Sequence, residues 1–256
     1  MKRLIIAALA ASAICAAFAS EDEAAAEKNW RITVGGFGRG DVKASVLGMG
    51  SDRVEVYGAD LDVQYSVWQN DMFNVWAGIG GTFCPRQGAS DGFGSSRSRS
   101  EHQSDGYTTY DFHYGEENRN SIDLGYGEFR LLLVPEWKAT DSLSLGVRLG
   151  VAFDWINAKC SGRQNWNWNS SFLIGMDPPD LDGESGGESW SESQTEFAAQ
   201  GIVGLQATYL FFENFGLYAN VDWRLGDKTE FDFGDDRHAS VDMSGWYWGV
   251  GAVVTF

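Results

Sequence analysis

The chain has 256 residues, of which 36 are acidic and 19 basic, so its formal net charge is -17. This balance excludes a general affinity for nucleic acid, because phosphate backbones attract basic surfaces. Glycine is abundant at 32 residues, aromatic residues make up 14%, and only 4 prolines occur. Such a composition favours many strands over helices or disorder.

Residues 1–19 have the pattern of a signal peptide. A basic start and a short apolar run end in small residues at Ala17–Ala19, an A-x-A cleavage site. The run is too short for a spanning helix, and Ile14 before Cys15 disfavours a lipoprotein site. Because no later stretch approaches about 20 consecutive apolar residues, a membrane protein built from the remainder would have to be a β-barrel.

The first predicted strand spans residues 30–47, after an acidic lead-in at residues 20–29. We interpret residues 30–256 as one domain. Apolar and polar side chains alternate along this first strand, which is the pattern of a strand with two different faces. Its apolar face is predicted to carry Trp30, Ile32, Val34, Val42, Ala44 and Val46.

The same alternation recurs along the chain. Further strands are predicted at residues 57–68, 73–83, 124–138, 142–155, 197–209, 217–225 and 246–256. Their connections are tight turns near residues 69–71, 140–141 and 213–214, long polar loops at 85–121 and 158–193, a brief turn at 48–52 and a medium loop at 227–239. Tight turns on one side and long loops on the other are typical of outer-membrane barrels with an even number of strands.

The apolar face could point into a soluble, lipocalin-like barrel or outward into lipid. The apolar parities carry no charged residue, whereas the opposite parities carry many, with arginine favoured over lysine. Lipid explains this purity better, since a charge at the bilayer midplane costs about 2–4 kcal/mol. Aromatic residues gather at the strand ends, as in interfacial girdles. The sequence therefore predicts an all-β, eight-stranded antiparallel up-and-down transmembrane β-barrel.

The chain resembles the eight-stranded outer-membrane barrels of the OmpA and OmpX type, within the porin-like group. The resemblance covers residues 30–256, and its most specific part is the closing sequence GVGAVVTF with Phe256 at its end. It implies a monomer in the bacterial outer membrane, surrounded by lipid and lipopolysaccharide, with Phe256 as a signal to the barrel assembly machinery. No periplasmic domain follows the barrel, so the peptidoglycan-binding role of that domain is not implied.

Charged side chains on the inward parities are expected to form an ion-pair network, since an eight-stranded barrel is just wide enough for side chains to fill it. We predict that this network closes the lumen; a narrow channel for ions or small solutes is the alternative. The predicted members are Arg31, Arg39, Asp60, Asp62, Glu128, Arg130, Arg148, Asp154, Asp222 and Arg224. Arg39 to Asp41 also belong to a GRGD sequence. A place in this inward ion-pair network explains these residues better than an adhesion motif does.

Cys84 and Cys160 remain after signal removal, and a disulfide between two long loops is predicted, with two free thiols as the alternative. The acidic segment around Asp177–Glu184 could bind calcium but is better explained as a solvated loop. His102, His113 and His238 lie in predicted loops without a complete catalytic group around them. We therefore assign no catalytic, cofactor-binding or metal residues.

The expected function is structural, or binding of an extracellular ligand through the long loops, where aromatic and amide side chains recur, as in NWNWN at residues 165–169. A narrow channel is the alternative, and a lipid-modifying outer-membrane enzyme is the second. For the last strand, we expect Val250 to face lipid and Gly251 to face the lumen and tolerate small polar replacements.

Overall fold

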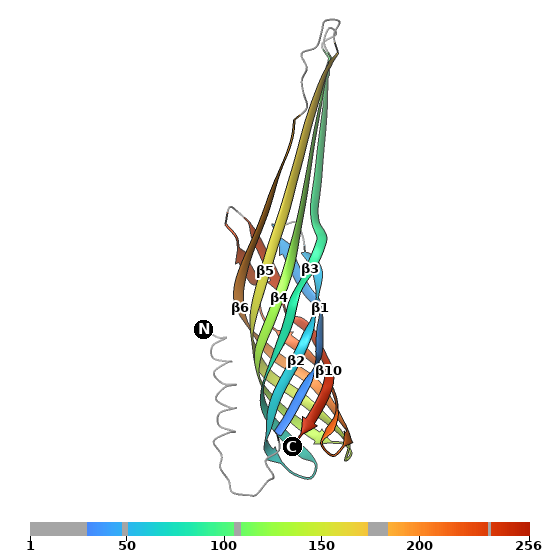
Figure 1. The fold of residues 1–256 in the computed structure, drawn as a ribbon, viewed down its shortest axis with the longest axis vertical. Coiled ribbons are helices and arrows are strands. Elements are labelled where there is room, and N and C mark those ends of the chain that lie inside the picture. Colours follow the sequence, from blue (N-terminus) through green and yellow to red (C-terminus); the bar gives the residue numbers. More distant parts are fainter. Residues whose placement is uncertain (1–29, 48–50, 105–108, 174–183, 235–236) are drawn as a thin grey trace.

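Eight strands close into a ring in the computed structural model (Figure 1). The structure describes residues 30–47, 51–104, 109–173, 184–234 and 237–256. All neighbours in the ring are antiparallel, and the last strand returns to pair with the first. The ring strands are β1 (Trp30–Val46), β2 (Ser51–Gln69), β3 (Phe73–Ser104), β4 (Thr109–Lys138), β5 (Leu143–Leu173), β6 (Glu184–Phe212), β7 (Phe215–Leu225) and β10 (Gly245–Thr255). The predicted eight-stranded antiparallel barrel is confirmed.

A small hairpin of β8 (Thr229–Asp232) and β9 (His238–Asp242) lies between β7 and β10 in the sequence, while β7 and β10 pair directly in the ring. It attaches to the outer end of β1, where Val46 pairs with Ala239. In the described part of the chain, no helix has the length and hydrophobicity needed to cross a membrane. The predicted signal peptide, the acidic lead-in and most of the acidic segment at 177–184 lie outside the described residues.

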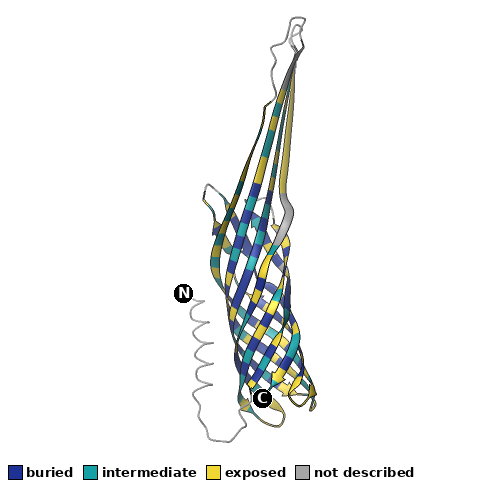
Figure 2. Ribbon diagram, viewed as in Figure 1, coloured by how far each residue is buried: buried dark blue, intermediate teal, exposed yellow. Residues whose placement is uncertain are grey.

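An apolar belt surrounds the ring, because large apolar side chains on the outward parities are exposed. Exposed and buried residues alternate along the barrel strands in Figure 2. Val250 is 50% exposed and Leu205 is 66% exposed. Aromatic side chains border the belt at both ends, and all of the following are exposed: Trp30, Phe73, Trp137, Phe211, Phe215 and Phe256 on the turn side, and Tyr57, Phe83, Trp155, Phe197 and Trp246 on the opposite side.

A β-bulge in β1 reverses the predicted orientation of its outer end. The register with β2 shifts between Arg39 and Val42. Because side chains alternate with a period of two, one extra residue exchanges the two faces beyond the bulge. Val42, Ala44 and Val46 are therefore buried inside the barrel, whereas the prediction placed them on the lipid face; Lys43 is exposed.

The described parts of the two segments predicted as long loops, 85–121 and 158–193, are strands. β3, β4, β5 and β6 have 32, 30, 31 and 29 residues and remain paired far beyond the other four ring strands. Pairing continues to Ser104 and Thr109 between β3 and β4, and to Trp168 and Glu184 between β5 and β6. Figure 1 shows this four-stranded extension rising from one side of the barrel. Most of its described residues are polar and only short runs carry aromatic side chains on one face, so the sustained apolar alternation that identifies a half-buried strand is missing.

Closure of the ring brings two glycines face to face, Gly35 of β1 and Gly251 of β10. A Cβ atom at Gly251 would lie 2.2 Å from the backbone oxygen of Val34 and 2.4 Å from the Cα of Gly35. The expectation that Gly251 tolerates small polar replacements is therefore wrong. The seam between the first and last strands requires a residue without a side chain at this point.

Candidate functional site

The ten charged residues predicted to line the lumen are all buried, with exposed fractions of 2% or less. They come from β1, β2, β4, β5 and β7, whose inward parities converge on the barrel axis. Glycine on the facing strands makes room for them. A Cβ at Gly80, for example, would lie 1.7 Å from Asp62 Oδ1.

Arg130 is the centre of this network. Its Nε donates to Asp62 Oδ1 at 2.7 Å, its Nη1 donates to Glu128 Oε1 at 3.1 Å, and its Nη2 contacts Asp60. Nη1 also lies 3.2 Å from the hydroxyl oxygen of Tyr247. One guanidinium therefore bridges carboxylates of β2 and of its own strand β4 inside the barrel, and Arg130 itself is fully buried.

Two further arginines extend the network toward β7. Arg148 Nε donates to Asp222 Oδ1 at 3.0 Å, and its Nη1 donates to Gln206 Oε1 at 2.8 Å. Arg224 forms an ion pair with Glu128 at 3.0 Å. Its guanidinium also lies 4.4 Å from the ring centre of Tyr247, a cation–π arrangement.

Arg31 lies nearer the turn side and has partners that the predicted network omits. Its Nε donates to Gln64 Oε1 at 2.7 Å, and its Nη1 contacts Glu136. The guanidinium lies 4.3 Å from the ring centre of Trp76. Glu136 and Gln64 have the inward parity in the sequence, so parity was the signal that could have identified them.

Arg39 and Asp154 are brought together through a tyrosine and not through an ion pair. Arg39 donates to the Tyr126 hydroxyl at 3.1 Å and to Gln200 Oε1 at 3.2 Å. The Tyr126 hydroxyl lies 3.2 Å from Asp154 Oδ1 and also contacts Glu128. Uncharged side chains, those of Tyr126 and Gln200, thus supply hydrogen bonds within a network that was predicted from charged residues alone.

Apolar side chains pack inside the barrel above this charged layer. The outer ends of the ring strands and the β8–β9 hairpin bury Phe37, Val42, Val54, Ile122, Ile156 and Phe231 in one cluster. A smaller cluster beside the network contains Trp76, Leu132, Val134, Ala152 and Ile202. The charged layer is thereby separated from the outer mouth by packed hydrocarbon, which favours a filled lumen over a water-filled one.

The extension carries different side chains on its two faces. One face has half-buried Phe112, Tyr114, Trp166 and Trp168, with Phe112 and Trp168 stacked at 6.4 Å between ring centres. Asn118 and Gln164 donate to Glu116 Oε1 at 3.0 and 2.9 Å, and Tyr114 donates to its Oε2 at 3.2 Å. The Asn118 amide, with these other donors, lowers the pKa of Glu116, so this carboxylate stays ionised at neutral pH.

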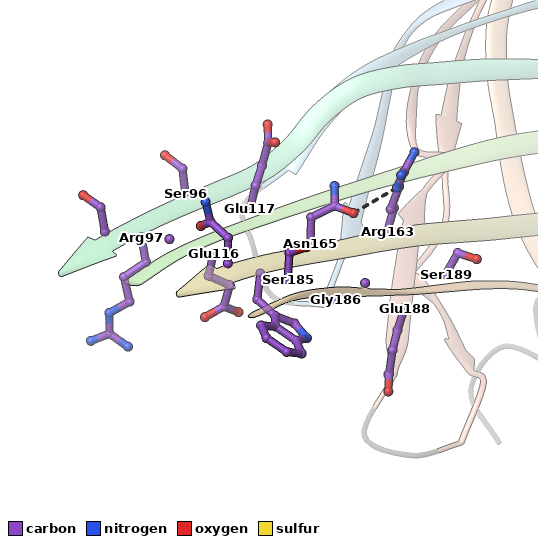
Figure 3. A pocket seen from close by; sticks show the side chains of 15 residues that line it. Ser96, Arg97, Glu116, Glu117, Arg163, Asn165, Ser185, Gly186, Glu188 and Ser189 are labelled. Carbon is purple, nitrogen blue, oxygen red and sulfur yellow. Dashed lines mark hydrogen bonds between the residues drawn. The ribbon is translucent and has the colours of Figure 1, made fainter. Parts of the chain in front are cut away.

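The opposite face is formed by serine, asparagine and glycine around a trough of about 910 Å³. Figure 3 shows Glu117, Asn165 and Arg163 on one side of the strands, with Arg97 and Glu116 on the other. Arg163 Nε donates to Asn165 Oδ1 at 3.1 Å. The NWNWN sequence accordingly divides between the faces, tryptophans on one and asparagines on the other.

The predicted disulfide is wrong, since Cys84 and Cys160 are both free and buried. Both lie within strands, on either side of β4, where Cys84 pairs with Tyr126 and Cys160 pairs with Ile122. Two strand spacings of about 10 Å, with an offset of four residues along β4, exceed the limit of about 7 Å between Cα atoms of a disulfide. Burial raises the pKa of the Cys160 thiol to about 12, which keeps it protonated.

The other predicted features lie apart from the lumen. His113 Nδ1 lies 2.9 Å from Ser100 Oγ on the exposed extension, and His238 begins β9. Among the described residues, no group of three or more potential ligands could hold a metal ion. Phe256 is 59% exposed, and its N–H donates to the Trp30 oxygen at 2.9 Å, which ties it to the first strand.

No protein-family model matches the chain, and no curated protein matches it in sequence. Solved structures that match include the outer membrane protein Ail of Yersinia pestis, 15% identical, covering 90% of this chain and 100% of that chain at a TM-score of 0.35. The outer membrane protein OprG of Pseudomonas aeruginosa is 12% identical, with 90% and 96% covered and a TM-score of 0.42. The outer membrane protease OmpT of Escherichia coli is 11% identical, with 92% and 99% covered and a TM-score of 0.37.

None of these proteins' activities transfers to the chain at such identities. Its own ring of strands and apolar belt give it the architecture of an eight-stranded outer-membrane β-barrel.

Proposed function

We propose that the protein is a bacterial outer-membrane barrel with a closed lumen, whose four-stranded extension recognises a ligand at the cell surface. The observation that carries this proposal is the extension itself: paired strands that hold organised side chains far from the barrel. A purely structural barrel would need only short connections. The sequence-based idea of loop-mediated binding is thereby replaced by binding to a sheet.

The outer-membrane location is supported by the apolar belt. Monomeric soluble proteins rarely expose contiguous apolar patches beyond a few hundred Å², whereas here exposed apolar side chains surround the ring. Aromatic girdles at both edges suit the two lipid–water interfaces. In this arrangement the belt contacts lipid and lipopolysaccharide, and the terminal strand with Phe256 contacts the assembly machinery.

The aromatic face suits an oligosaccharide. Indole and phenol rings stack on the apolar faces of sugar rings, and Trp166, Trp168 and Tyr114 lie on one face of the extension. Side-chain amides and carboxylates between them can bond to sugar hydroxyl groups. The strands hold these groups in place before binding, so little conformational entropy is lost when a ligand binds.

Shortening the extension is expected to abolish this binding and to spare the barrel. Residues 97–116 and residues 166–186 are each replaced by Asn-Gly, which joins paired residues Ser96 and Glu117, and Asn165 and Gly187, by two-residue turns. Binding is measured on an array of surface oligosaccharides, with full-length and shortened protein in nanodiscs.

A second variant, full-length protein with Trp166→Ala and Trp168→Ala, keeps the strands and removes the stacking rings. Binding lost in both variants supports recognition by the aromatic face. Equal binding by the shortened and full-length proteins would refute it.

A narrow channel is the second candidate, because ionisable groups within a membrane are functional candidates by default. We expect no sustained conductance from the purified protein in planar bilayers, since guanidinium and carboxylate groups pair directly inside the lumen. Sustained openings in a salt gradient would favour the channel. A porin recorded in the same bilayers is the positive control.

A lipid-modifying enzyme has less support. The Ser100–His113 pair lies on the extension, whereas a lipid substrate would lie against the belt. No observation at the belt favours this activity.

A further inference from the structure

Beyond Phe83, β3 has a neighbouring strand on one side only among the described residues. β2 accompanies it as far as the pair Ala59–Phe83, whereas β4 accompanies it to Ser104. After two register shifts, pairing with β4 is regular from Phe93 onward. Alternate residues there direct backbone N–H and C=O groups away from β4, where no described strand receives them.

The opposite edge of the extension belongs to β6. β7 pairs with β6 only from Gly201 onward, so nearer the tip β5 is the one described strand that pairs with β6. Part of this edge is covered, because Asp232 N donates to Gln194 Oε1 at 2.9 Å and Arg237 forms an ion pair with Glu192 at 3.1 Å. The segment 184–191 has no described strand along its free side.

The two free edges carry opposite charges. Arg97 and Arg99 are exposed on β3, and Glu184 and Glu188 are exposed on β6. Arg99 pairs with Glu101 in a solvent-exposed contact, and such contacts contribute little. Glu188 forms no ion pair with any described residue. Unpaired strand edges are templates for another chain, and here the two templates are complementary.

We propose that copies of this chain standing in one membrane join edge to edge, with β3 of one copy pairing with β6 of the next. β3 runs away from the barrel and β6 runs back toward it. Two copies with the same orientation therefore present these strands antiparallel. The arrangement rests on the proposed membrane location, which fixes that orientation.

The register within the extension would bring the arginines of β3 opposite the glutamates of β6 in the next copy. Arg99, Tyr114, Trp168 and Glu184 form one cross-strand row, so a copy displaced sideways puts its Glu184 opposite Arg99. In the next row the incoming residue opposite Arg97 is Gly186, which leaves space, and Glu184 and Glu188 lie diagonally on either side. All of these side chains lie on one face, as cross-strand pairing requires.

Symmetric pairing is disfavoured by the same features. A two-fold axis along the membrane normal would place β3 beside β3 in parallel, arginine against arginine, and β6 beside β6 with glutamates together. The β3–β6 contact is heterologous, so every added copy leaves one edge of each kind free. The expected product is an array or a closed ring of barrels, in contrast to the monomer expected from the sequence.

Cysteine cross-linking tests the contact in full-length protein in outer membranes. Ser98 and Ser185 occupy one row on the other face, so Ser98→Cys and Ser185→Cys in the same chain should form disulfides between copies upon mild oxidation. Within one chain the two positions are three strand spacings apart, about 14 Å, which is too far for a bridge. We expect a ladder of dimers, trimers and larger species, absent from either single variant.

Charge reversal is the second arm. In the two-cysteine chain, Arg97→Glu with Arg99→Glu should reduce cross-linking at least tenfold, and adding Glu184→Arg with Glu188→Arg should restore it. Arg119→Glu, on central strand β4, is the matched control and should leave the ladder unchanged.

An impermeant maleimide applied to cells with Ser98→Cys reports surface display separately. Labelling without a ladder, a ladder unaffected by charge reversal, or cross-linking by Ser98→Cys alone would each overturn edge pairing. Absent labelling in protein that has inserted would overturn the proposed topology and, with it, the inference.

Discussion

Replacing Arg130 with methionine is expected to lower the free energy of unfolding by about 3–5 kcal/mol, because removing one partner of a buried ion pair leaves an uncompensated charge. Three carboxylates, on Asp60, Asp62 and Glu128, contact Arg130 inside the barrel, and all are buried. Burial prevents water from replacing the lost guanidinium. The measurement is denaturant unfolding of the reconstituted protein, followed by tryptophan fluorescence.

Arg99→Met is the matched control. Arg99 also pairs with a carboxylate, that of Glu101, but its side chain is 71% exposed. Exposed pairs of this kind contribute about 0–1 kcal/mol, so the control should change stability little. Asp60→Asn added to Arg130→Met should recover part of the loss. Equal effects of the two arginine substitutions would contradict a buried network.

The second large effect is expected at Val250, where arginine should cost about 2–4 kcal/mol if the side chain faces the middle of the bilayer. Val250 lies midway along β10 and is half exposed on the apolar belt. Refolding into lipid vesicles, measured as the folded fraction against denaturant, gives the change in stability.

Val254→Arg provides the depth control. This valine is on the same parity but near the rim, beside the terminal Phe256, where an arginine should cost only about 0–1 kcal/mol. A small effect at both positions would mean that the outward face is not in lipid.

The ring and its charged layer could be predicted because lipid imposes a strict period of two. A residue such as Arg148 between Val147 and Leu149 can only point inward, and all three side chains do lie as this alternation requires. The pattern identifies charged members of the lumen but says nothing of their partners. Tyr126 and Gln200 were therefore missed, although both have the inward parity.

The extension could not be predicted because both of its faces lie in water. Serine alternates there with arginine from Ser96 to Ser100, and asparagine alternates with tryptophan over only the five residues 165–169, so the sequence resembles a polar loop. The predicted disulfide depended on that error, since a loop could have brought Cys84 toward Cys160 and a strand cannot. The bulge after Arg39 could not be predicted either. Most apolar residues of β1 occupy even-numbered positions both before and after the bulge, so the sequence gives no sign that the two faces exchange.

The barrel is surrounded by two different media along its axis, lipid around the apolar belt and water around the outer end. In the belt, polar residues are inside and apolar residues outside, while at the outer end Val54 and Ile122 are inside and Arg53 and Lys159 face outward. Local opening of the outer end transfers its apolar interior to water, so this local opening carries a positive heat-capacity change. Its stability against local opening accordingly weakens on cooling, as in soluble proteins.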